Sequence, residues 1–233
     1  MNWTTLYEKI LPYIVSIETP NGAGTGFLFA YNEDKTIVAF ATAAHVVKHE
    51  DDWKLPIKLR HFKTGKEITV TDEDRVIFVH SKLDSASILL FSEPSIRFPL
   101  TTLPLMDPKK FLHIGSEVGW VGFPYLAESN LCFFSGPISA RLKDDNSYLI
   151  DGVAINGVSG GPVFYSSKDS DGHEIPKIIG TVSSYLWNTQ LEGNLPGLMK
   201  IQDVTAFHGY ISFIKSMDEA RKKKAEQKRK QSR

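Results

Sequence analysis

Short runs of apolar and β-branched residues alternate with turn-forming residues along most of this chain of 233 residues. The runs either follow a period of two or are continuously apolar over a few residues, which is typical of β-strands. Few helical patterns lie between the runs, whereas a parallel α/β sheet needs a helix between successive strands. The chain is therefore expected to be all-β and to form a sandwich or barrels.

The expected strands form two sets separated by a proline-rich, aperiodic stretch at 92–112. We expect this stretch to be the crossover between two β units. A short helix ended by Pro12 is expected before the first set, and a C-terminal helix from about Asp203 that frays beyond Lys222 is expected after the second. The strands of the first set are 13–17, 26–30, 36–42, 57–61, 67–70, 76–80 and 87–91, and those of the second are 117–122, 132–141, 148–152, 162–164, 177–185 and 198–201.

The charges are unevenly distributed although the formal net charge is zero. Residues 216–233 carry eight Lys or Arg against three acids, which leaves the rest of the chain mildly acidic. An acidic body argues against a nucleic-acid-binding face on it. The basic tail lacks interleaved aromatic residues, so only weak, salt-sensitive contacts with nucleic acid or an anionic membrane are expected from it.

The single cysteine, Cys132, excludes an intrachain disulfide. This fits a reducing compartment, although secreted bacterial proteins show the same pattern. No signal peptide is expected because the first ten residues lack a basic region followed by an apolar run, and no apolar run is long enough to span a membrane. We expect a cytoplasmic location and no cofactor or metal.

The most specific segment is 156–163, in which glycines flank Ser159. Such a serine can present its hydroxyl to a cleft, and Gly157 can adopt backbone angles that turn its N–H inward beside that of Ser159. Two such donors stabilise an oxyanion by about 10²–10³ in rate each. Gly-x-Ser-Gly alone is equally typical of a turn between strands, but the following Gly161 and Pro162 favour the catalytic interpretation.

Two further segments place His45 after an apolar strand and Asp84 just before another. Alone, a histidine at a strand end is more often structural, and such an aspartate is most often a turn or edge residue. Together with Ser159 they occur in the chain order His, Asp, Ser, which makes the catalytic interpretation much stronger.

These three segments resemble the catalytic blocks of trypsin-like serine peptidases, above all of the bacterial HtrA-like branch. Gly24–Leu28, Val121–Pro124 and 135–140 resemble flanking strands and turns of that family, so the similarity spans about residues 13–202. No PDZ-like domain follows, the loop before the serine is one residue shorter, and the basic tail has no counterpart in the family.

The resemblance implies a chymotrypsin-like fold of two six-stranded antiparallel β-barrels, with a short N-terminal helix and a C-terminal helix. Residues 1–98 would hold the N-terminal helix and the first barrel, 99–202 the crossover and the second barrel, and 203–233 the C-terminal helix and basic tail. His45 and Asp84 would lie in the first part and Ser159 in the second.

The resemblance also implies the roles of these residues in cleaving a polypeptide substrate. Ser159 would attack the scissile carbonyl, His45 would act as general base and then general acid, and Asp84 would hold the imidazole in the required tautomer. The N–H groups of Gly157 and Ser159 would form the oxyanion hole.

The family's geometry places the first specificity pocket at residues 153–156 and 183–185. No acid stands at its expected base, so a small or medium apolar side chain at the cleavage site is predicted instead of Lys or Arg. Val158 precedes the serine, where secreted zymogens carry an aspartate, so regulation is expected to use loop ordering or a protein partner. The expected pocket residues are Val153, Ala154, Ile155, Asn156, Ser183, Ser184 and Tyr185.

Two alternatives belong to other classes of protein. The motif around Ser159 also fits the nucleophile elbow of an esterase, but that fold needs the order Ser, Asp, His and alternating helices, and only His173 and His208 follow the serine. A catalytically silent binding module, or a latent peptidase that needs a partner, would carry the same three residues with His45 displaced or the Gly157 turn collapsed.

Overall fold

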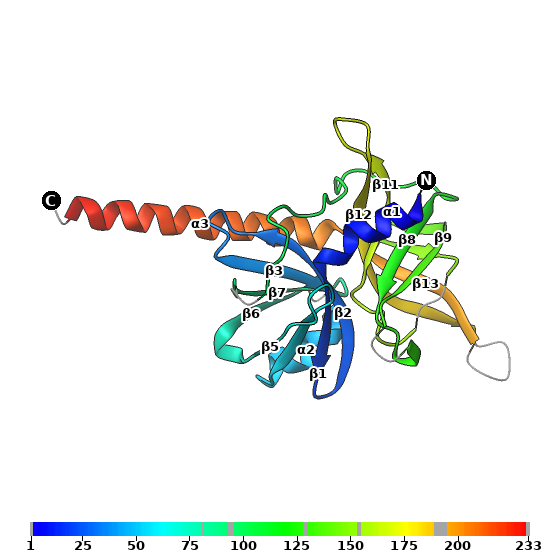
Figure 1. Cartoon of the computed structure of the whole chain (residues 1–233), viewed down its shortest axis with the longest axis horizontal. Coiled ribbons are helices and arrows are strands. Elements are labelled where there is room, and N and C mark those ends of the chain that lie inside the picture. Colours follow the sequence, from blue (N-terminus) through cyan, green and yellow to red (C-terminus); the bar gives the residue numbers. More distant parts are fainter. Residues whose placement is uncertain are drawn as a thin grey trace.

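Two β units lie side by side, and a long C-terminal helix extends away from them (Figure 1). The computed structural model describes residues 2–80, 82–92, 96–127, 130–152, 155–188 and 195–231. The arrangement confirms the expectation of a mostly β protein with a helix at each end of the described chain.

The first unit is a seven-stranded antiparallel sheet with the strand order β5-β4-β1-β2-β3-β7-β6. All seven expected runs form strands, but the sheet does not close into the six-stranded barrel that the family resemblance implied. The strands are β1 (Ile14–Thr19), β2 (Gly22–Tyr31), β3 (Ile37–Thr42), β4 (Ile57–His61), β5 (Glu67–Val70), β6 (Arg75–His80) and β7 (Ser85–Phe91).

A side chain, instead of a ladder of backbone hydrogen bonds, joins the two edge strands of this sheet. Arg75, buried at the start of β6, donates from Nη1 to the Val70 carbonyl at the end of β5 over 3.0 Å. Its Nη2 donates to the carbonyls of Glu50 and Leu55 over 2.9 and 2.7 Å. The guanidinium thus ties the start of β6 to the end of β5 and to the end of α2 and the loop that follows it.

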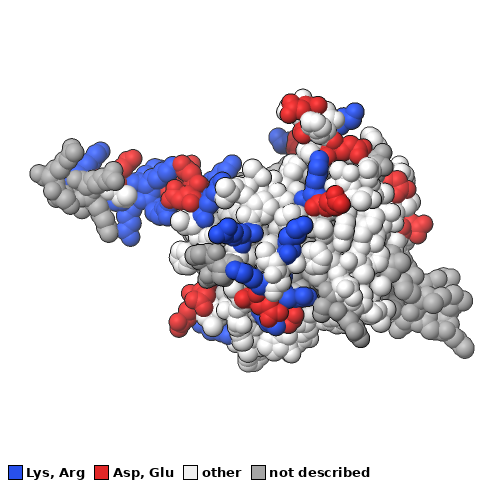
Figure 2. All heavy atoms as spheres, in the orientation of Figure 1, with Lys and Arg blue, Asp and Glu red and all other residues white. Residues whose placement is uncertain are grey.

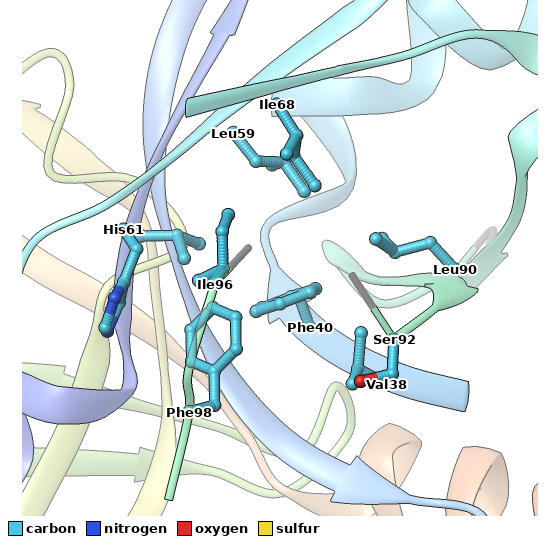
Figure 3. A pocket seen from close by; sticks show the side chains of 10 residues that line it. Val38, Phe40, Leu59, His61, Ile68, Leu90, Ser92, Ile96 and Phe98 are labelled. Carbon is cyan, nitrogen blue, oxygen red and sulfur yellow. The ribbon is translucent and has the colours of Figure 1, made fainter. Parts of the chain in front are cut away.

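Side chains from the crossover fill the interior of the curled sheet. Figure 3 shows Ile96 and Phe98 reaching in beside Phe40, and only about 10 Å³ remains free among the surrounding side chains. The rings of Phe40 and Phe98 meet at 5.2 Å between centroids, and that of the buried His61 lies 4.5 Å from Phe98. The crossover therefore completes the core that a closed barrel would make from strands alone.

The second unit is a closed barrel with the strand order β10-β13-β12-β11-β8-β9, which confirms the expected second barrel. Trp120 fills its centre and stacks on Phe134, with ring centroids 5.8 Å apart. The strands are β8 (Glu117–Gly122), β9 (Cys132–Leu142), β10 (Ser147–Ile150), β11 (Pro162–Lys168), β12 (Glu174–Asn188) and β13 (Leu195–Asp203).

One helix lies at the N-terminus, and a second lies between β3 and β4 of the first sheet. The helix α1 (Trp3–Ile10) begins at Asn2, whose side chain accepts from the Thr5 N–H over 3.2 Å, and it buries Leu6 and Ile10. The helix α2 (Ala44–Asp52) was not expected, because the sequence indicated a strand end there. Short 3₁₀ turns are η1 (Leu11–Tyr13), η2 (Asp72–Asp74) and η3 (Tyr125–Ala127).

The C-terminal helix α3 (Thr205–Gln231) is continuous, so the expected fraying beyond Lys222 is wrong. Lys, Ala, Glu and Gln are strong helix formers, and Glu219 and Glu226 stand four residues before a lysine. Lys and Arg side chains gather on the protruding end of this helix (Figure 2). None of the helices in the described ranges is both long enough and apolar enough to cross a membrane.

Candidate active site

His45 and Asp84 come together because β3 and β7 are neighbours in the first sheet. Thr42 at the end of β3 pairs with Ala86 of β7, so the chain leaving one strand lies beside the chain entering the other. His45 is the second residue of α2, and its Nδ1 lies 2.8 Å from Asp84 Oδ2. Its backbone N–H donates to Asp84 Oδ1 over 3.0 Å, so one carboxylate holds both the ring and the backbone of the histidine.

The environment of Asp84 keeps it ionised. Burial raises the pKa of this carboxyl, but the hydrogen bonds from His45 and from the Ser183 hydroxyl, at 2.7 Å, outweigh that effect and leave the pKa below its ordinary value. An ionised carboxylate only accepts hydrogen bonds, so the His45 Nδ1 must carry a proton. In the neutral imidazole, Nε2 is then free to accept one.

Ser159 lies in the turn that leads into β11, and this turn depends on glycine. Gly157 and Gly160 have φ values of 95° and 82°. A Cβ on Gly160 would lie 2.2 Å from the Thr25 carbonyl oxygen, so no other residue fits there without displacing β2. The turn therefore packs directly against the first unit.

The buried Thr25 of β2 holds this turn through two hydrogen bonds and makes a third to Phe123. Its N–H donates to the Ser159 carbonyl over 2.8 Å, and its hydroxyl donates to the Gly157 carbonyl over 2.8 Å. The same hydroxyl accepts from the Phe123 N–H over 3.0 Å. Thr25 was not assigned a role from the sequence, where its one signal is its place in Gly24–Leu28, the segment that resembles a strand of the family.

The peptide unit before Gly157 is oriented by Tyr125. The Tyr125 N–H donates to the Asn156 carbonyl over 2.9 Å, so the N–H of Gly157 points the opposite way across this trans peptide. Among the described groups, neither the Gly157 N–H nor the Ser159 N–H has an acceptor. Two backbone donors of the serine turn are therefore unpaired, as the donors of an oxyanion hole must be before substrate binds.

Two cavities flank Ser159 and His45, and both residues line each of them. One has a volume of about 230 Å³ and is also lined by Ile155, Asn156, Val182, Ser183, Ser184 and Tyr185. Five expected pocket residues thus lie together, while Val153 and Ala154 fall outside the described residues. No described lining residue of this cavity is acidic.

The other cavity, of about 260 Å³, was not anticipated from the sequence. It lies between the β1–β2 turn, α2 and Tyr125, and it is lined by Thr19, Asn21, Gly22, Ala23, Val46, His49, Glu50, Tyr125, Asn156 and Gly157 besides His45 and Ser159. The cleft therefore continues on both sides of the serine. The Ser159 hydroxyl makes no hydrogen bond to any described side chain, so the structure joins His45 to Asp84 but not to Ser159, which shares only the cleft with His45.

The described residues offer one cluster with metal-ligand spacing, and it lies away from the cleft lining. Asp169, Asp171 and His173 stand on the hairpin between β11 and β12. Asp169 Oδ1 accepts from the N–H groups of the other two residues, at 3.0 and 2.8 Å, which accounts for the cluster as a turn.

Comparisons with known proteins agree with this fold. Residues 24–170 match the family model of the trypsin-like peptidase domain. No curated protein matches the sequence. Solved structures share the fold at low sequence identity, so they carry the fold alone.

Three of these structures are similar over most of this chain. Deg5 has 19% identity and a TM-score of 0.60, with 88% of this chain and 89% of that chain covered. An inactive serine-to-alanine mutant of Rv3671c from M. tuberculosis has 17% identity and a TM-score of 0.59, with 90% and 89% covered. The HtrA-type protease AlgW with a tripeptide has 16% identity and a TM-score of 0.62, with 88% and 61% covered.

The family match covers well over half of the chain. This chain shares its overall fold with these three solved structures. This fold supports a serine peptidase in general. The chain belongs to the trypsin-like peptidase domain family.

Proposed function

We propose that this protein is a serine endopeptidase that uses Ser159 as nucleophile, His45 as general base and acid, and Asp84 to orient the histidine. The observation that carries this proposal is the double hold of Asp84 on His45, at 2.8 and 3.0 Å, beside a glycine turn whose serine lines the same two cavities. That arrangement places a base with a free Nε2 and an unbonded serine hydroxyl in one cleft, where no hydrogen bond yet joins the two.

Peptide hydrolysis would proceed in two acyl-transfer steps. His45 Nε2 takes the Ser159 proton as the hydroxyl oxygen attacks the scissile carbonyl, and Asp84 stabilises the resulting imidazolium. The unpaired N–H groups of Gly157 and Ser159 stabilise the oxyanion of the tetrahedral intermediate. The imidazolium then protonates the leaving amine, and a water molecule, deprotonated by His45, releases the acyl group.

The cleavage site is proposed to carry a small or medium apolar side chain. The cavity lined by Ile155, Val182 and Tyr185 supports this, because none of its described residues is an acid that could pair with Lys or Arg. The AlgW structure contains a tripeptide, which supports a polypeptide as the substrate class.

Labelling with a biotinylated fluorophosphonate tests the nucleophile. Mass spectrometry should locate the label on Ser159, and both Ser159→Ala and His45→Ala should lose it. Ser212→Ala, on the exposed face of α3, is the matched control and should label like the wild type. A wild-type protein that does not react, or one labelled at Ser159 without need of His45, would contradict the proposal.

A further inference from the structure

The first half of β2 is an open sheet edge next to Ser159. β1 pairs with β2 from Gly22 to Phe27, whereas β3 pairs with it only from Phe27 onward. On the side left by β3, the Thr25 N–H is bonded to Ser159 and the Thr25 carbonyl accepts from the Thr42 hydroxyl over 2.8 Å. Outward-facing backbone groups alternate along a strand, so the next such pair belongs to Ala23.

The hydroxyl of Tyr125 occupies both outward groups of Ala23. It accepts from the Ala23 N–H over 2.6 Å, and it lies 3.4 Å from the Ala23 carbonyl, to which it donates. An added strand would use a carbonyl and an N–H to make these same two bonds. One phenol hydroxyl therefore stands where the backbone of a bound peptide would stand.

Tyr125 reaches this position from the second unit, across the cleft. Its ring lies against the serine turn, because a Cβ added to Gly157 would be 3.1 Å from Tyr125 Cδ1. About half of the residue, 52%, is exposed to solvent. A half-exposed side chain held by one short and one long hydrogen bond can move aside at low cost.

The open edge lines the cavity on the far side of Ser159 from the proposed cleavage-site pocket. Ala23 and Tyr125 line it together with His45 and Ser159, and the pocket of Ser183 and its neighbours lies on the other side. A polypeptide that crosses the serine thus brings the residues after the scissile bond to this edge.

We propose that Tyr125 is a specificity-determining gate that a polypeptide must displace in order to add its leaving-group segment to β2 at Ala23. The inference rests on the proposed function for the direction of the substrate. A ligand that ends at the scissile residue does not compete with the Tyr125 hydroxyl for the backbone of Ala23. A ligand that continues past this residue must replace the hydroxyl with its own backbone groups. Since a net hydrogen bond is worth about 0.5–1.5 kcal/mol, removing the hydroxyl should favour extended peptides by about two- to tenfold.

Binding to a Ser159→Ala background tests the gate without turnover. The probes are fluorescein-labelled Ala-Ala-Pro-Val, which stops at the cleavage-site residue, and Ala-Ala-Pro-Val-Ala-Ala-Ala, which continues past it. Tyr125→Phe keeps the ring and the backbone bond to Asn156 and removes the hydroxyl alone. We expect the dissociation constant of the longer peptide, divided by that of the shorter, to fall about two- to tenfold.

Tyr165→Phe, on β11 and outside the lining of both cavities, is the matched control and should leave this ratio unchanged. An unchanged or higher ratio in Tyr125→Phe overturns the gate, as does failure of the longer peptide to bind either protein. Because the measurement needs no catalysis, a protein that fails fluorophosphonate labelling yet shows the fall in ratio would refute the peptidase proposal and leave the gate standing.

Discussion

Replacing Thr25 with valine should damage both the stability of the protein and the position of Ser159. The two side chains have nearly the same shape, so Thr25→Val removes the hydroxyl and little else. The buried Gly157 carbonyl would lose its donor, and the Phe123 N–H would lose its acceptor. The bond from the Thr25 N–H to the Ser159 carbonyl would remain.

The size of the effect follows from these two unmet groups. A buried backbone group left without a partner costs about 1–3 kcal/mol, so Thr25→Val should lower the free energy of unfolding by about 2–6 kcal/mol. Thr25→Ser keeps the hydroxyl and deletes one buried methyl group, which costs about 1 kcal/mol. The valine variant should therefore be the less stable of the two by at least about 1 kcal/mol.

Urea unfolding of the two variants measures this difference, and the rate of fluorophosphonate labelling at Ser159 measures the second effect. The valine variant should react at least about tenfold more slowly than the serine variant, since the Gly157 carbonyl no longer anchors the turn. Equal stability and equal labelling of the two variants would show that the Thr25 hydroxyl does not hold the turn.

Three other changes have definite expected outcomes. Asp84→Asn should slow labelling of Ser159 by about 10⁴-fold because an amide favours the wrong tautomer of His45, and a loss below about tenfold would contradict the proposed role. Burial lowers the pKa of His61 below its usual 6.5, so the contribution of this residue to the free energy of unfolding should be complete above pH 6.5 and fall as the pH drops below it. The melting temperature should therefore be lower at pH 5.5 than at pH 7.5, and His61→Gln should reduce this difference. Arg75→Met removes three hydrogen bonds to backbone carbonyls, although the Glu50 carbonyl keeps the Leu55 N–H as a donor. It should lower the free energy of unfolding by about 2–4 kcal/mol in urea, whereas an unchanged midpoint would mean that water replaces the guanidinium.

The strands could be predicted because their signals are local. Alternation over a few residues locates each of the thirteen strands, and turn residues separate them. Closure of a sheet is not local. In the first sheet Arg75 bridges the edge strands, and Ile96 and Phe98 fill the interior. The alternation of the strands marks neither contact, although Val70 is only five residues from Arg75.

The candidate site divides in the same way. The expected order His45, Asp84, Ser159 came from short motifs, and the structure brings His45 and Asp84 into contact and places Ser159 in the same cleft. Thr25 and Tyr125 escaped notice because their partners lie about a hundred or more residues away. The helix α2 was missed because it is only nine residues long and no side chain caps its start, so no helix signal follows the strand expected at 36–42. The cytoplasmic location stays a prediction.

The helix α3 links the two units and thereby limits how the cleft can open. It starts directly after β13 of the closed barrel, yet Phe207 packs on Phe29 of the first sheet with ring centroids 5.2 Å apart. Further along, the Tyr210 hydroxyl donates to the carbonyl of Ser85, the neighbour of Asp84, over 3.2 Å. The buried Asp218 accepts from the Glu33 N–H over 2.7 Å, so the helix is fixed to the first unit over several turns.

A rotation of one unit against the other must therefore either bend the chain between β13 and α3 or pull the helix off the first sheet. Because α3 packs on the first sheet, its amide protons should exchange with solvent together with those of β2 and β7. A ligand that binds α3 and the first sheet together would then restrict the movement of the two units against each other, and with it the opening of the cleft between His45 and Ser159.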